Sequence, residues 1–142
     1  MTLQINLERV KNDLYTVGRY GYNPDDQGVY RQGFSDEDIK ARAWFQKKLA
    51  DLELKNYMDG AGNVIGRLGR DDQKALLIGS HLDSVPAGGM FDGVLGAIAG
   101  LECIRILQEN QVPLKHALEV IGTSEEEGRF GGMLGAQALT GN

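Results

Sequence analysis

Two short apolar runs flank one long helical pattern between residues 75 and 123, and this order restricts the fold more than any other feature. Residues 75–80 (ALLIGS) and 117–123 (ALEVIGT) have the continuous apolar character typical of buried strands. Residues 92–109 predict a buried helix, because the pattern is apolar nearly all round at its start. A strand–helix–strand unit of this kind makes a parallel, right-handed crossover. We therefore expect an α/β fold in which both strands end at the same edge of a sheet.

The rest of the chain adds helices and a hairpin to this unit. Apolar spacing predicts helical segments in three further ranges: 6–17, 36–52 and 131–139. Strands at 54–59 and 63–68 flank a Gly-Ala-Gly turn, which indicates a hairpin. Residues 18–33 are expected to form a long loop, and loops of that length are often functional. No linker divides the chain, so residues 1–142 are expected to form one unit with a mixed sheet flanked by helices.

Composition excludes several classes of partner. The chain has 15 Lys and Arg against 20 Asp and Glu, a net charge of −5, which argues against nucleic acid or an anionic membrane as partner. No apolar run is long enough to span a bilayer, and the first residues lack an apolar signal segment, so a cytoplasmic location is expected. Cys103 is the single cysteine, which rules out an internal disulfide and a cysteine-built zinc site. We expect Cys103, Trp44 and Phe45 to lie in the core.

Polar side chains follow both strands of the crossover unit. His81 and Asp83 come directly after the first strand, and the triplet Glu125–Glu127 follows the second. Ligands bind outside the carboxyl ends of strands in open α/β sheets. Carboxylates held close together repel one another unless a proton or a cation compensates, and imidazole and carboxylate groups are ligands for zinc, manganese or cobalt. A capped structural histidine and a solvated acidic run are the ordinary alternatives, but buried strands leading into both groups favour a metal site.

The surroundings of these groups refine the prediction. Asp83 is placed to orient the His81 imidazole through a hydrogen bond, as ligating histidines usually require. His116 precedes the second strand and is expected at the surface of the opposite edge. The chain contains neither a nucleophile elbow nor a phosphate-binding loop.

These residues stand in motifs that resemble a known family. GSHLDSVPAGGMFDGVLG followed by TSEEEGRFGG is similar to the dinuclear-metal hydrolases of metallopeptidase family M20, and most similar to their N-carbamoyl-L-amino-acid hydrolase and allantoate amidohydrolase branch. GVYRQGFSDEDIKARAWFQKKL also resembles the amino-terminal region of that branch. The resemblance implies that residues 1–142 are the amino-terminal part of a zinc-peptidase-like catalytic domain, without the lid and dimerisation domain.

The resemblance also implies roles for individual residues. His81 would bind one metal ion, Asp92 would bridge two, and Glu127 would bind the second. Glu126 would be the general base, and Asp83 would orient His81. The acidic triplet leaves a second register open, in which Glu125 is the base and Glu126 the ligand. The implied cofactor is a pair of divalent ions, zinc first, with manganese, cobalt or nickel as alternatives.

The activity implied is hydrolysis of C–N bonds other than peptide bonds, in small ureido or amide substrates such as N-carbamoyl amino acids or allantoate. A peptidase or aminoacylase that shares the metal site is the first alternative, and a non-catalytic fragment is the second. Because the family takes further histidine ligands from sequence beyond residue 142, the isolated chain is expected to be inactive. A homodimer is implied for the longer protein.

Overall fold

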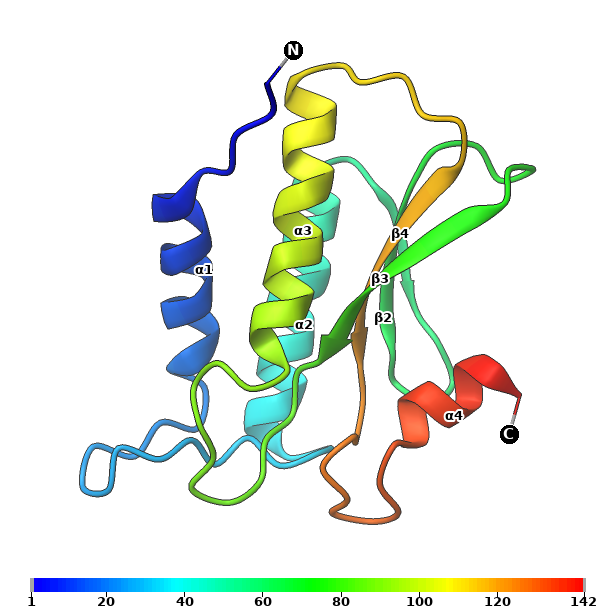
Figure 1. Ribbon diagram of the computed structural model, residues 1–142. Coiled ribbons are helices and arrows are strands. Elements are labelled where there is room, and N and C mark those ends of the chain that lie inside the picture. The colour runs from blue at the N-terminus through cyan, green and yellow to red at the C-terminus, as the bar shows by residue number, and fades with distance from the viewer. Residues whose placement is uncertain (1, 142) are drawn as a thin grey trace.

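A four-stranded mixed sheet in the order β1-β2-β4-β3 organises the fold in the computed structural model, which describes residues 2–141 (Figure 1). Strands β1 (Lys55–Met58) and β2 (Val64–Leu68) form the predicted antiparallel hairpin. Strand β4 (Ala117–Thr123) pairs antiparallel with β2 and parallel with β3 (Ala75–His81). The parallel β3–β4 pair confirms the predicted crossover unit.

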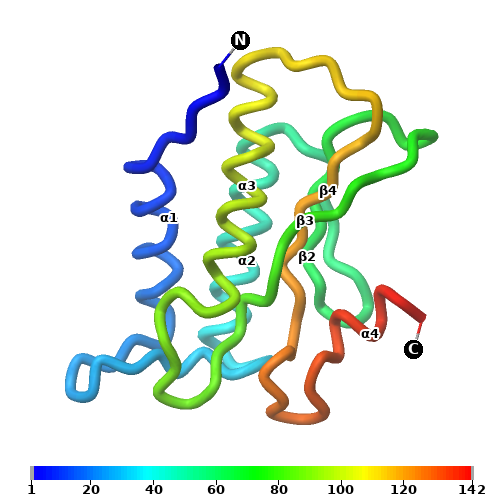
Figure 2. Tube along the Cα trace, in the orientation of Figure 1, coloured from blue at the N-terminus to red at the C-terminus, as the bar shows by residue number. Residues whose placement is uncertain are grey.

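Three helices cover one face of the sheet, and a fourth lies on the other face (Figures 1 and 2). They are α1 (Leu7–Gly18), α2 (Asp36–Asp51) and α3 (Val94–Glu109) on the first face, and α4 (Leu134–Thr140) on the second. Ser35 caps α2 by accepting a hydrogen bond from the backbone N–H of Asp38. Among residues 2–141, no helix combines the length and the apolar character needed to cross a membrane.

The core fills the space between these three helices and the sheet. Phe45 from α2, Leu101 from α3 and Val120 from β4 are fully buried in it, and the half-buried Trp44 packs against it. Each fully buried apolar side chain of this size stabilises the fold by roughly 1.5–3 kcal/mol.

Two expectations about burial are wrong. Strand β3 lies at the edge of the sheet, and Leu76, Leu77 and Ile78 are 60%, 50% and 42% exposed. An apolar run does not reveal how many neighbours a strand has, and β3 pairs only with β4 within residues 2–141. Cys103 is also exposed, because it lies on the side of α3 that faces away from the sheet and lines a shallow apolar groove.

Three loops meet at one end of the sheet (Figure 1). They are residues 82–93 after β3, residues 124–133 after β4, and the predicted long loop between α1 and α2. The register pairs His81 at the end of β3 with Thr123 at the end of β4. The parallel pairing therefore brings both polar loops to the same place, as the sequence predicts.

Candidate metal centre

His81 is the last residue of β3, and one nitrogen of its imidazole contacts a backbone oxygen. Its Nδ1 atom lies 3.0 Å from the backbone oxygen of Asp83. A carbonyl oxygen only accepts, so Nδ1 must carry the proton, which leaves the lone pair of Nε2 free. His81 is buried but keeps this nitrogen turned toward the loops. That is the tautomer a metal ligand needs.

Asp92 reaches the same place from the loop before α3. The next residue, Gly93, begins that helix with φ of +65°, a conformation that residues with a side chain rarely adopt. A Cβ atom on Gly93 would lie 2.4 Å from Cε1 of His81. The chain can pass this close to the imidazole only because residue 93 lacks a side chain. The helix predicted from Asp92 onward therefore begins at Val94, since Gly93 turns the backbone.

Glu127 approaches from the loop after β4, and a link to β3 fixes its backbone. The carboxylate of Asp83 accepts hydrogen bonds from the backbone N–H groups of Glu126 and Glu127, at 3.2 and 3.1 Å. Asp83 is expected to orient His81 through a hydrogen bond. Its backbone oxygen makes the contact with the imidazole, while its Oδ1 lies 3.8 Å from Nδ1. The carboxylate is already occupied by the two amides.

Glu125 points away from these groups. It is fully buried, and its carboxylate accepts backbone N–H bonds from Phe130, Gly131 and Gly132 at 2.8, 3.2 and 3.0 Å. Burial alone would raise the pKa of Glu125, but these amide donors hold it below its ordinary value. Its backbone has φ of +53°, which is uncommon for a residue with a side chain. The first glutamate of the triplet thus shapes the loop that presents the other two.

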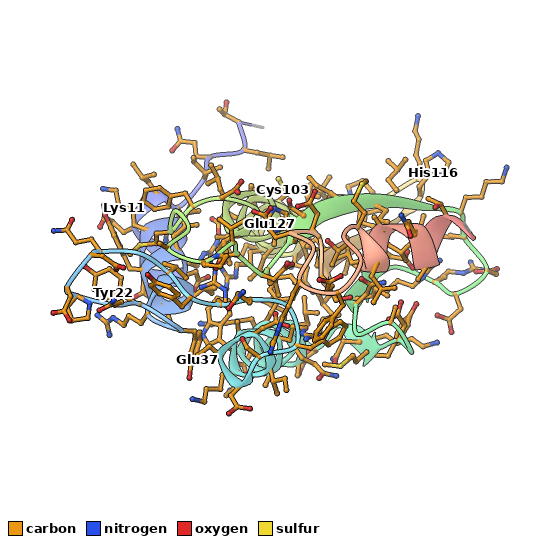
Figure 3. All side chains as sticks on the ribbon, turned by 90° about the horizontal axis from the view of Figure 1, so that it is seen from below. Lys11, Tyr22, Glu37, Cys103, His116 and Glu127 are labelled. Carbon is orange, nitrogen blue, oxygen red and sulfur yellow. The ribbon has the colours of Figure 1, made fainter. Side chains whose placement is uncertain are left out.

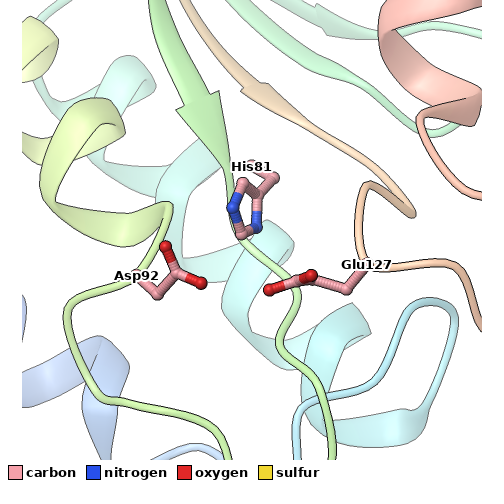
Figure 4. Close-up of side chains that lie close together, drawn as sticks. All are labelled: His81, Asp92 and Glu127. Carbon is pink, nitrogen blue, oxygen red and sulfur yellow. The ribbon is translucent and has the colours of Figure 1, made fainter.

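The three predicted ligands converge (Figure 4). One ligand atom each from His81, Asp92 and Glu127 lies within 4.8 Å of the others. Glu126 borders the group, with Oε2 3.8 Å from Nε2 of His81 and its side chain 38% exposed. His116 lies at a distant margin of the molecule, well apart from Glu127 (Figure 3). One imidazole and two carboxylates in this arrangement form a donor set for a divalent cation.

The pKa of Glu127 is consistent with a site that binds a cation. Burial raises the pKa of the Glu127 carboxyl above its ordinary value, a hydrogen bond shared with Asp92 raises it further, and His81 opposes the rise. Two carboxylates that face each other in this way repel when both are ionised. A divalent ion would compensate the same charges, so the residues fit a metal.

Sequence reasoning missed two residues of this site. Gly93 stands in the FDG motif, but only the close approach to His81 shows why a side chain is excluded there. From the sequence, Glu125 is expected only as the base of the alternative register, since nothing in a run of three glutamates distinguishes an anchored member from its neighbours. The GGM stretch at residues 131–133 was the available signal, because glycines let backbone amides approach a carboxylate closely.

Comparisons with known proteins agree with this fold. An N-carbamoyl-L-amino acid amidohydrolase from Geobacillus stearothermophilus is 40% identical over 139 residues, and the match covers 94% of this chain and 34% of that protein. Allantoate deiminase 1 of Glycine max is 37% identical, with 90% of this chain and 27% of that protein covered. The crystal structure of a hydantoinase/carbamoylase family amidase from Burkholderia ambifaria has a TM-score of 0.91 at 35% identity, over 98% of this chain and 35% of that one.

These relatives confirm the resemblance to the N-carbamoyl-amino-acid and allantoate hydrolases that the motifs predicted. The chain spans about a third of the length of the relatives it matches. Peptidase family M28 matches residues 63–141, which include the hairpin strand β2, the crossover unit and all three converging ligands. The chain belongs to peptidase family M28.

Proposed function

We propose that this chain forms the metal-binding part of an amidohydrolase that cleaves C–N bonds other than peptide bonds. The observation that carries the proposal is the convergence of His81, Asp92 and Glu127 at the ends of two parallel strands. Relatives named as an N-carbamoyl-L-amino acid amidohydrolase and an allantoate deiminase support the substrate class. The substrate is then a small ureido or amide compound.

The proposed cofactor is a pair of divalent ions. His81 would hold one ion, Glu127 would hold the other, and Asp92 would be shared between them. A ligand atom of Asp92 lies within 4.8 Å of one from His81 and of one from Glu127, which supports this division (Figure 4). A divalent ion in such a site polarises the substrate carbonyl and activates water.

The chain's own residues supply the proton transfers. Glu126 takes a proton from the attacking water and delivers it to the leaving nitrogen, as a general base and then a general acid. Its carboxylate borders the ligand group and remains partly open to solvent. The anchored position of Glu125 supports the register in which Glu126 is the base and Glu127 the ligand. For a carbamoyl substrate the products are ammonia, carbon dioxide and the free amino acid.

Cleavage of a peptide or acyl bond is the second candidate. The name of the matching family, peptidase family M28, favours it, and the same ligand set would serve either reaction. The two reactions differ in the first product released. Ammonia identifies a carbamoyl or ureido substrate, whereas a dipeptide releases a second amino acid.

A hybrid protein tests the activity. Residues 1–142 would replace the matching third of the Geobacillus stearothermophilus amidohydrolase. We expect ammonia release from N-carbamoyl amino acids in the presence of zinc, manganese, cobalt or nickel, and none from a hybrid carrying Asp92→Asn. Dipeptide cleavage without ammonia release would favour the peptidase. A folded hybrid that binds metal and turns over neither substrate would favour a non-catalytic role for these residues.

Zinc as the metal and a homodimer of the longer protein complete the proposal, and the family resemblance supports both. A cytoplasmic location is proposed with them. Metal analysis of protein purified without added metal tests the first. Light scattering of the hybrid tests the second, and fractionation of cells that express the native gene tests the third.

A further inference from the structure

A buried arginine lies behind the candidate metal centre. Arg31 belongs to the long loop between α1 and α2, and its side chain is fully buried. Its Nε donates to the backbone oxygen of Leu82, and its Nη1 donates to the backbone oxygens of Val17 and Tyr20. The guanidinium thus joins the end of α1 to the segment that follows β3.

Leu82 is the residue between His81 and Asp83, so the Arg31 contact acts at the centre of the turn that presents both. The backbone of the arginine adds a second brace, since its N–H donates to Oγ of Ser84 and its oxygen accepts from the Ser84 N–H. Three groups of Arg31 therefore hold Leu82 and Ser84: Nε, the backbone N–H and the backbone oxygen.

Burial of the Arg31 guanidinium in this arrangement is energetically unfavourable. Within residues 2–141, Nη2 of Arg31 has no hydrogen-bond partner, and the acceptors of the other two nitrogens are neutral carbonyls. Asp38 and Asp83 are the negative charges that act on it from nearby. Burying an ion without a paired counter-ion carries a large desolvation penalty. The guanidinium nevertheless fixes the position of the Leu82 carbonyl.

We propose that Arg31 is a positioning residue for the metal centre, which fixes the Leu82 carbonyl so that His81 presents Nε2 and Asp83 holds the amides of the glutamate loop. This assignment rests on the proposed function for its role in metal binding. Its structural part, the orientation of His81, stands on the contacts alone. Contacts of this kind behind a ligand typically change metal affinity by about 10- to 100-fold when removed.

The test compares three variants of the 142-residue chain. Arg31→Met removes the charge and all donors, Arg31→Lys keeps the charge with fewer donors, and Arg105→Met is the matched control. Arg105 is also buried, but it pairs with Asp13 and lies about 18 Å along α3 from Gly93 at 1.5 Å per residue. Both methionine variants are expected to lower Tm.

Two readouts separate positioning from simple stability. The first is the tautomer of His81 in metal-free protein at fixed pH, from nitrogen-15 NMR of the imidazole, with the exposed His116 as internal reference. The second is the affinity for Zn²⁺ by calorimetry below Tm. We expect Arg31→Met to lose the uniform Nδ1–H tautomer and to weaken Zn²⁺ binding about 10- to 100-fold. Arg31→Lys should fall between it and the wild type, and Arg105→Met should match the wild type in both readouts.

The outcomes are distinguishable. If wild-type protein binds no Zn²⁺, the proposed function fails while the NMR signal still decides the role of Arg31. If Arg31→Met keeps the wild-type tautomer, and its Zn²⁺ affinity equals that of Arg105→Met, Arg31 is not a positioning residue. Should Arg31→Met fail to fold, the same two readouts on Arg31→Lys decide, and wild-type values there would overturn the proposal.

Discussion

The carboxylate of Asp83 accepts a hydrogen bond from the backbone N–H of Glu127 at 3.1 Å, which ties the loop after β3 to the loop after β4. His81 and Glu127 therefore do not approach each other as two independent loop residues. Their separation is set by one residue that contacts both, through its backbone oxygen on one side and its side chain on the other. Ligands that are positioned before a metal arrives lose less conformational entropy on binding.

Gly93 is predicted to be intolerant of any side chain. Gly93→Ala should destabilise the fold by about 1–3 kcal/mol through its backbone conformation, and its Cβ should displace the His81 imidazole. Zn²⁺ affinity should therefore fall together with the free energy of unfolding. Gly60→Ala is the control, because a Cβ at Gly60 meets no atom within 4 Å. Calorimetry and urea unfolding measure both effects, and unchanged Zn²⁺ affinity in Gly93→Ala would contradict the account.

The order of roles in the glutamate triplet can be tested in the hybrid protein. Glu126→Gln should keep its metal and lose turnover by about 10²- to 10⁴-fold, since it removes the base and little else. Glu125→Gln should instead lower Tm, because an amide would place its own N–H groups against the backbone N–H groups of the loop. Metal analysis and kinetics of both variants distinguish the registers. Loss of metal in Glu126→Gln, with metal retained in Glu125→Gln, would show that the roles are shifted by one residue.

An ion-pair cluster between α1 and α3 should make stability depend on pH. Burial alone would raise the pKa of Glu102, but hydrogen bonds from Arg9 and from the Asn6 N–H hold it below its ordinary value of 4.5. Ionised Glu102 therefore stabilises the fold fully above that value, and the contribution is lost as the pH falls through the lower folded pKa. Glu102→Gln should reduce the free energy of unfolding by about 1.5–3 kcal/mol at pH 7.

Urea unfolding at a series of pH values measures this effect. The difference between wild type and Glu102→Gln should shrink below about pH 4.5. Glu37→Gln is the control, because Glu37 pairs with Lys40 at the surface, and such pairs contribute little. A difference that stays constant from pH 7 to pH 3 would contradict the assigned role of Glu102.

Much of the fold follows from periodicity, and the errors have physical causes. The parallel crossover was predictable because apolar runs of strand length flank a helical pattern, and β4 occupies the predicted residues 117–123. The edge position of β3 was not, since ALLIGS would look the same in a central strand. The exposure of Cys103 was missed because α3 is apolar on more than one side, and its contacts with neighbouring elements decide which side is covered.

In the candidate site too, some residues could be predicted from the sequence and others could not. His81, Asp92 and Glu127 were predictable because each stands in a motif next to a strand or helix end. Arg31 was not, since it lies in a loop without periodicity and acts on a carbonyl that is 51 positions away in the chain. The amide contacts of Asp83 were also beyond reach, because they depend on the path of the loop after β4.

The edge strand predicts how the 142-residue chain behaves alone. Leu76, Leu77 and Ile78 are exposed on β3, whose outer edge is unpaired within residues 2–141. Exposed apolar edges of this kind promote association between chains. We expect concentration-dependent self-association in light scattering and a shift toward monomer in Leu77→Lys. The matched change Tyr15→Lys, at an exposed position on α1, should leave association unchanged. A wild-type chain that stays monomeric at high concentration would contradict this prediction.

The central claim is that His81, Asp92 and Glu127 bind divalent ions, and anomalous diffraction at the zinc edge from crystals of the chain grown with Zn²⁺ tests it most directly. We predict two anomalous peaks that share Asp92, one about 2.0–2.2 Å from Nε2 of His81 and the other at that distance from a carboxylate oxygen of Glu127. Zinc bound only at other positions, with these three side chains unliganded, would contradict the claim.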